Sequence, residues 1–250
     1  MTMKLIAATA LVTMFSTSAW AQVTVSASQT DNDLIPDYVP GNLSIVSENI
    51  NLNNTGIQSI TSVSVTLNVA AGDNGVPWNG DYYAYLTDPS GSIAILLNRV
   101  GVTDASNPND FGYSDAGFDI TLSDSGPDIH DYNNYSPSFN GDGQLTGTWG
   151  PDGRNSSPFS VQASDPRTAL LDVFDGSGAN GAWTLAIADA SSGDFGVLDG
   201  WSLEVSGTGA TQTVPDGGGA WALPLLSGLG LLLFARRSAR PLTVAQGKAR

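Results

Sequence analysis

Cysteine is absent from the 250-residue chain. Disulfide bridges, on which small secreted scaffolds rely, therefore cannot hold this fold together. Its stability must come from a hydrophobic core large enough to stand alone, with bound ions as a further source.

Positive charge is also scarce. The chain carries 9 basic and 24 acidic residues, which gives a formal net charge of -15. Between Gln22 and Thr213 there is no lysine, and the only cations are Arg99, Arg154 and Arg167. Since nucleic acid phosphates are bound by clustered Lys and Arg, this distribution excludes nucleic acid as a partner. The acidic side chains serve solubility or supply carboxylate ligands for calcium, and the sequence leaves both interpretations open.

Helical periodicity is nearly absent, whereas strand signals are frequent. Residues 62–69 alternate polar and apolar side chains with period two, which predicts a strand with Val63, Val65, Leu67 and Val69 on its buried face. Turn-forming Gly, Asn, Asp and Pro clusters separate the strand-like runs. These runs are 42–46, 62–69, 82–86, 92–97, 117–122, 183–188 and 201–205. The pattern predicts an all-β fold, an antiparallel β-sandwich of jelly-roll, galactose-binding-like type.

Two stretches depart from the strand pattern. Residues 103–160 are rich in Gly, Asp, Asn, Ser and Pro and predict long loops interrupted by a strand around Phe118. Residues 165–174 have some helical character and predict a short helical turn or an irregular crossing.

The N-terminus has the form of a secretory signal. Lys4 precedes an apolar run, and the small-residue pattern Ala19-Trp20-Ala21 allows cleavage by signal peptidase before Gln22. We therefore assign residues 1–21 to a signal peptide and expect the chain to be exported.

The C-terminus combines a motif, an apolar segment and a basic cluster. The motif is Val214-Pro215-Asp216-Gly217-Gly218, the apolar segment spans 220–235, and Arg236 and Arg237 follow. This order resembles the PEP-CTERM sorting signals, and the resemblance implies an exosortase-like enzyme as a partner. In such a signal the apolar segment halts export in the inner membrane, and the arginines stay on the cytoplasmic side. A permanent single-span anchor is the alternative, although 16 residues are few for a full span of about 20.

Ordered motifs in the body resemble the proprotein convertase P domain, also called the P/Homo B domain. They run from Gly80 to Leu203 and, in the family pattern, extend over about residues 33–207. The matching segments are Gly80-Asp81, 85–92, 97–101, Phe118-Asp119, 147–151, 174–176, 180–185, Asp189, 193–198 and 201–203. Two departures stand out: Tyr82 and Tyr83 follow Gly80-Asp81 where the family prefers an aliphatic residue, and Ile120 stands where a second aspartate is expected after Asp119.

The resemblance and the pattern divide the chain into consecutive parts. After the signal we expect a leader at 22–32 and a P-domain-like sandwich at 33–207. A linker with the sorting motif follows at 208–219, then the hydrophobic segment at 220–235 and a basic cytoplasmic tail at 236–250. Such a chain belongs to the cell envelope, outer surface or extracellular matrix.

The last two expected strands carry the strongest core signal. Trp183 and Leu185 share one face of their strand, and Trp201 and Leu203 share one face of the next. We expect these four residues in the core, because aromatic side chains bury large apolar areas. The loop between the strands carries Asp189, Asp194 and Asp199, which bind a calcium ion together or merely cap turns. Asp81 and Asp119 are further candidate calcium ligands, and no other cofactor is indicated.

No catalytic constellation stands out. The single histidine, His130, lies in an acidic loop and is expected to be solvated, and no serine sits in a nucleophile elbow. P domains usually follow a protease domain, but no subtilisin-like motif occurs here. We therefore expect a protein that is not an enzyme and has a structural, adhesive or binding role, with exopolysaccharide as a candidate partner. The alternative is an accessory that stabilises a separately encoded subtilisin- or kexin-like protease.

Overall fold

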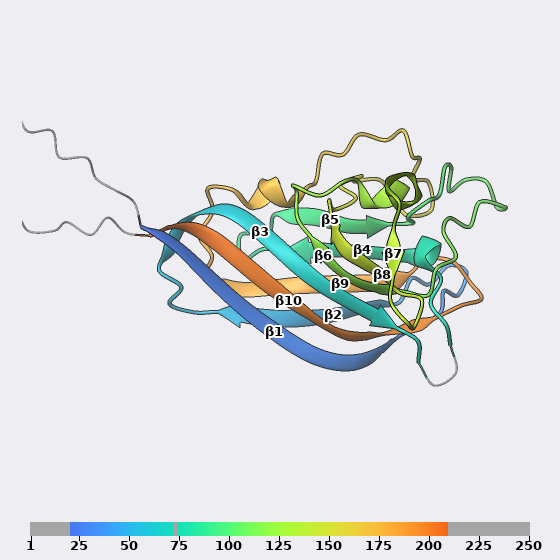
Figure 1. The fold of residues 1–250 in the computed structure, drawn as a ribbon, viewed down its shortest axis with the longest axis horizontal. Helices are drawn as coiled ribbons and strands as arrows, with labels where there is room; N and C mark the ends of the chain where they lie inside the picture. The colour runs from blue at the N-terminus through green and yellow to red at the C-terminus, as the bar shows by residue number, and fades with distance from the viewer. Residues whose placement is uncertain (1–20, 73–74, 210–250) are drawn as a thin grey trace, which may run out of the picture. The chain divides into compact units, whose positions relative to one another are not determined.

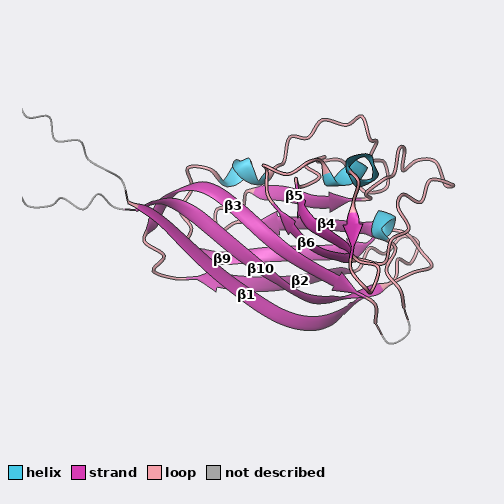
Figure 2. Ribbon diagram, viewed as in Figure 1, coloured by secondary structure: helices cyan, strands magenta, loops and turns pink. Residues whose placement is uncertain are grey.

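Residues 21–72 and 75–209 are described by the computed structural model, and they form a β-sandwich (Figure 1). A six-stranded sheet has the order β1-β10-β3-β6-β8-β7, and a four-stranded sheet has the order β2-β9-β4-β5. The all-β sandwich expected from the sequence is confirmed. Figure 2 shows that strands dominate and that the helical pieces are short.

The element bounds follow in chain order. The strands are β1 (Gln22–Ile35), β2 (Ile45–Leu52), β3 (Ile57–Ala70), β4 (Tyr82–Thr87), β5 (Ile93–Asn98), β6 (Phe118–Leu122), β7 (Ser138–Phe139), β8 (Leu145–Trp149), β9 (Gly181–Asp189) and β10 (Gly196–Gly209). The 3-10 helices are η1 (Asn79–Asp81), η2 (Ile129–Tyr135) and η3 (Leu171–Phe174).

The alternation in β3 shows how the sequence directs this fold. Val63, Val65, Leu67 and Val69 are buried, while the serine, threonine and asparagine residues between them face solvent. Because side chains in a strand point alternately to opposite faces, one face enters the core and the other meets water. β-branched valines also favour the extended backbone.

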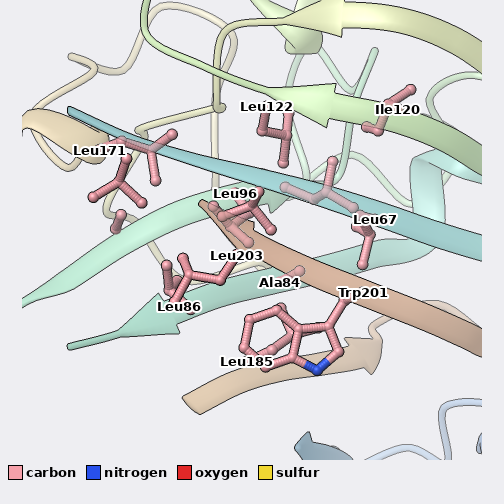
Figure 3. Packing of buried hydrophobic residues seen from close by; sticks show 14 of the residues in the cluster. Leu67, Ala84, Leu86, Leu96, Ile120, Leu122, Leu171, Leu185, Trp201 and Leu203 are labelled. Carbon is pink, nitrogen blue, oxygen red and sulfur yellow. The ribbon is translucent and has the colours of Figure 1, made fainter. Parts of the chain in front are cut away.

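The core lies between the two sheets. Figure 3 shows Leu67, Trp201 and Leu203 from the six-stranded sheet facing Ala84, Leu86 and Leu185 from the four-stranded sheet. The structure buries Trp183, Leu185, Trp201 and Leu203, all at 2% exposure or less. The Trp183 ring packs edge-on against Phe174, and its Nε1 donates to the Ala179 carbonyl at 3.0 Å.

The sequence predicts a leader at 22–32 before the sandwich begins at residue 33, and this boundary is wrong. These residues form most of β1, which pairs with β10 from Gln22 opposite Thr208 to Ile35 opposite Gly196. The signal in β1 is weak because its inward side chains, Val23, Val25 and Ala27, are small and only half-buried at the sheet edge. The chain thus enters and leaves the sandwich at the same end of one sheet.

The loop-rich region also holds more sheet than expected. Within 103–160, β8 pairs in parallel with β6, so the sandwich is not wholly antiparallel. Thr146, Gly147 and Thr148 carry little apolar signal, and a parallel partner cannot be recognised from a hairpin turn. Residues 165–174 follow an irregular path that ends in the short helix η3. The sequence predicts a short helical turn or an irregular crossing for this stretch.

Several sequence assignments fall outside the described residues. They are the signal peptide up to residue 20, the sorting motif 214–218, the hydrophobic segment 220–235, and Arg236 with Arg237. In the ranges 21–72 and 75–209, no helix has the length and apolarity needed to span a bilayer.

Candidate functional site

Two buried carboxyl groups meet where β4 begins and β9 ends. Asp81 is the last residue of η1, Asp189 is the last residue of β9, and Tyr82 is the direct cross-strand partner of Asp189. The Ala190 amide donates to the Asp81 carbonyl at 2.7 Å and fixes the two chain segments against each other. The residues Asp81, Tyr82 and Asp189 are at most 4% exposed.

Each of these three side chains has an oxygen without a hydrogen-bond partner among the described residues. The atoms are Asp81 Oδ1, Asp189 Oδ2 and the Tyr82 hydroxyl oxygen. The other oxygen of Asp189, Oδ1, accepts from the Ser191 amide at 2.9 Å. An unpaired buried polar atom costs about 1–3 kcal/mol, and more for a charged group, so three together are unusual in a folded protein.

Arg99 lies beside the pair but does not neutralise it. Its Nε donates to the Gly80 carbonyl at 2.5 Å, and its Nη1 lies 3.5 Å from the Ala190 carbonyl. The approach of its Nη2 to Asp81 Oδ1 is 3.9 Å, too long for a hydrogen bond. The guanidinium therefore orders the backbone around the site, and its charge offsets only one of the two carboxylates.

The electrostatics reflect this deficit of positive charge. Burial raises the pKa of Asp81 to about 7, although the Arg99 charge opposes the rise. Burial also raises the pKa of Asp189 to about 8, with a further contribution from the Asp81 charge. The charges of Asp37 and Asp194 add to the rise for Asp81. Without a compensating cation, these groups hold protons near neutral pH.

The calcium ligands considered in the sequence separate into two groups. Asp194, on the loop between β9 and β10, is half-buried, and its charge acts on both Asp81 and Tyr82. Asp199 lies within β10, exposed, where it accepts from Asn68 Nδ2 at 3.2 Å. Asp119 is exposed on β6. The structure therefore sets Asp81 and Asp189 together, leaves Asp194 on the flanking loop as a charge that acts on Asp81, and places Asp199 and Asp119 on the solvent side of the six-stranded sheet.

Sequence reasoning missed Tyr82 and Asp37 as parts of this environment. Asp37 follows β1 and accepts from the Gly193 amide at 3.1 Å, which ties it to the same loop as Asp194. No short-range spacing signals this proximity. The only hint for Tyr82 was its departure from the aliphatic residue typical of the P-domain pattern.

His130 contradicts the expectation of a solvated loop histidine, because its side chain is fully buried. Its Nδ1 lies 2.8 Å from Asp152 Oδ2, and its Nε2 lies 2.8 Å from the Val102 carbonyl oxygen. Both partners are acceptors, so both ring nitrogens must donate and the ring is an imidazolium. Burial alone would lower the pKa of His130, but the hydrogen bond and charge of Asp152 outweigh it and raise the pKa.

The imidazolium belongs to a buried network of charges. Arg154 pairs with Asp152 at 3.2 Å and with Asp128 at 3.0 Å, and Arg167 lies 3.4 Å from Asp128. This network fixes the loops that follow β5, β6 and β8. Since the His130 ring faces a carboxylate and a backbone carbonyl, neither nitrogen is directed at a serine hydroxyl as a catalytic base would be.

A second acidic group lies at the irregularity of β1. One carboxylate oxygen each of Asp31, Asp33 and Glu48 lies within 4.8 Å of the others. Gln29 Nε2 donates to Asp31 Oδ1 at 2.7 Å and to Glu48 Oε2 at 2.5 Å. Asp33 is exposed and Asp31 and Glu48 are half-buried, so this group is more open to water than the Asp81 and Asp189 pair.

Comparison with known proteins gives distant structural similarities, two of them to one serine protease. No family model and no curated protein sequence matches the chain. The serine protease of Aeromonas sobria in complex with its chaperone shares 16% identity at a TM-score of 0.41, over 76% of this chain and 28% of that one. The same protease alone shares 15% identity at a TM-score of 0.38, over 75% of this chain and 27% of that one. The chain thus spans under a third of the proteases it matches, and the P-domain assignment stays a prediction.

Proposed function

We propose that this chain is an exported, non-enzymatic β-sandwich protein of the cell envelope or extracellular matrix, which adheres to neutral polysaccharide. The observation that carries the proposal is the solvent face of the six-stranded sheet, where hydroxyl side chains stand in rows across neighbouring strands. The sequence signals at both ends support export and sorting.

One row of hydroxyl groups crosses five strands. Its members are cross-strand partners in succession: Ser28 on β1, Ser202 on β10, Thr66 on β3, Thr121 on β6 and Thr148 on β8. Neighbouring strands in a sheet lie about 4.8 Å apart, so the row presents a hydroxyl at each such step. The neighbouring row holds Ser26, Glu204 and Ser64.

The chemistry of this face suits a polymer rich in hydroxyl groups. Serine and threonine hydroxyls both donate and accept hydrogen bonds, so they can exchange bonds with sugar hydroxyls in either direction. The net charge of -15 repels polyanions, which favours a neutral or cationic polysaccharide. The position of His130, held between Asp152 and Val102, supports a role without acyl-transfer catalysis.

Binding is tested with matched pairs of threonine variants on the two sheets. Thr66 and Thr121 form a hydroxyl contact at 3.5 Å on the proposed face, whereas Thr87 and Thr184 are paired on the outer face of the four-stranded sheet. We expect T66V/T121V to weaken cosedimentation of the protein with neutral exopolysaccharide from the native host, and T87V/T184V to leave it unchanged. Equal binding by both variants, or no binding by the unmodified protein, would refute the polysaccharide role.

Export and sorting are tested separately by intact mass spectrometry of the protein from its native host. The proposal predicts loss of residues 1–21 and of the segment after the sorting motif. A mass that retains residues 220–250 would indicate a permanent anchor instead. Copurification of a serine protease in stoichiometric amount would favour the accessory role.

A further inference from the structure

We infer that Asp81, Asp189 and Tyr82 form a binding site for a divalent cation that prefers oxygen ligands, with calcium as the ion of choice. This inference concerns the interior of the sandwich, so it stands or falls independently of export and of polysaccharide binding.

The unpaired atoms provide the geometric argument. Three residues that are each at least 96% buried keep one side-chain oxygen without a partner in the described part of the chain. Tyr82 and Asp189 face each other across the ladder between β4 and β9, and Asp81 immediately precedes Tyr82. A bound cation satisfies the orphan oxygens together, whereas no described side chain does so.

The charge in this region points to a cation. Asp81 and Asp189 are opposed only by Arg99, whose contacts go to the Gly80 and Ala190 carbonyls. Asp37 and Asp194 contribute further negative charge from the flanking loops. The described residues around the site therefore carry four carboxyl groups and one guanidinium, an imbalance that a divalent ion compensates.

The donor set selects the kind of ion. The orphan atoms are all oxygens, two of them from carboxyl groups, with no imidazole or thiolate among them, and carboxylate oxygens suit calcium and magnesium better than zinc or copper. Calcium accepts irregular arrangements and bidentate carboxylates, and water completes its shell of six to eight ligands. Magnesium demands near-octahedral geometry, which a site assembled from two strand ends and a loop does not readily provide.

The ion would join two parts of the fold. It connects the start of β4 with the end of β9, at the end of the sandwich where Ala190 already bonds to Asp81. A ligand that binds only the folded state stabilises it in proportion to the logarithm of its concentration. Calcium therefore acts as a clamp on the sandwich, in a protein without disulfides.

The test compares thermal unfolding of the purified full chain in EDTA and in calcium, at constant ionic strength. At a calcium concentration 100 times the dissociation constant we expect the melting temperature to rise by about 5–10 °C. The variant D189N should lose this rise, because its amide supplies no charge. In EDTA, D189N should melt no lower than the unmodified protein, since without a cation Asp189 already holds a proton and the neutral amide has nearly the same size.

Matched variants assign the effect to the site. D199N and D119N change exposed carboxylates and should keep the full calcium shift. D33N should also keep it, because the open group of Asp31, Asp33 and Glu48 is a separate cluster. No calcium shift in the unmodified protein overturns the inference, and so does a shift that survives D189N but disappears in D33N.

A spectroscopic readout keeps the test independent of folding stability. Terbium binds calcium sites and emits when a nearby tyrosine or tryptophan is excited. We expect terbium emission that calcium displaces, and a loss of at least half of it in Y82F, which keeps the ring volume but removes the hydroxyl ligand. Unchanged emission in both Y82F and D189N would locate terbium elsewhere and refute the assignment.

Discussion

The buried carboxylate of Asp152 offers the sharpest test of the structure. The substitution Asp152→Asn keeps the size of the side chain but removes the negative charge that faces two cations. Asp152 lies 2.8 Å from His130 Nδ1 and 3.2 Å from Arg154 Nη1, and it also accepts from the Arg154 amide at 3.2 Å.

The magnitude follows from what the variant leaves behind. Removing one partner of a buried ion pair costs about 3–5 kcal/mol, because the remaining charge is left uncompensated. Two features moderate the loss: Arg154 keeps its 3.0 Å contact with Asp128, and His130 can release its proton. We therefore expect D152N to lower the free energy of unfolding by about 3 kcal/mol, and the melting temperature by about 6–12 °C.

The assay is urea unfolding followed by tryptophan fluorescence at pH 6, where the imidazolium is populated, with calcium held constant. The midpoint should fall while the slope stays unchanged. D119N is the matched control, since Asp119 is exposed on β6, and its unfolding free energy should stay within about 0.5 kcal/mol. A loss below about 1 kcal/mol for D152N would refute the assignment of a buried, charged His130 and Asp152 pair.

Three further predictions test other parts of the fold. Trp183→Ala should lower the free energy of unfolding by about 3–5 kcal/mol in urea titrations, because the fully buried ring packs against Phe174, and an effect under about 1 kcal/mol would contradict its place in the core. The folded-state pKa of His130 is raised, so the stability advantage of the unmodified protein over H130Q should be complete below about pH 6.5 and shrink as pH rises through the folded pKa. Titration of Asp81 and Asp189 occurs in both proteins and cancels in this difference, so an advantage that grows with pH would contradict the charged ring. Gly80→Ala should lower the melting temperature in differential scanning calorimetry, since a Cβ on residue 80 would lie 2.0 Å from the Phe111 carbonyl oxygen. Gly91→Ala is the control: no atom lies within 4 Å of the added Cβ, so its melting temperature should fall only by the cost of an alanine at positive φ.

The general architecture was accessible from the sequence because it depends on local pattern. Alternation in β3 and the tryptophan strands β9 and β10 predict strands with one buried face, and the turn residues between them predict a sandwich. The edge strand β1 was missed for the converse reason. Its inward side chains are small and give way to Gln29 and Asp31, so little apolar contrast distinguishes the strand from a leader.

The candidate site was accessible only in part. Aspartates near strand ends drew attention to Asp81, Asp189 and Asp194, but nothing in their spacing separated them from Asp199 and Asp119. Whether a carboxylate is buried depends on which strands become neighbours. The ladder that sets Tyr82 opposite Asp189 joins residues far apart in the chain, and no local pattern reports it.

By itself the sequence determined the composition-dependent properties: an acidic, cysteine-free β protein with a core centred on Trp183 and Trp201. These follow from residue type and from a periodicity of two, which each strand carries within itself. Tertiary structure alone decided the parallel pairing of β6 with β8, the burial of His130 against Asp152, and the burial of Asp81 and Asp189 where β4 begins and β9 ends. Each of these depends on contacts between distant segments, and burial then sets the charge state of the groups that meet there.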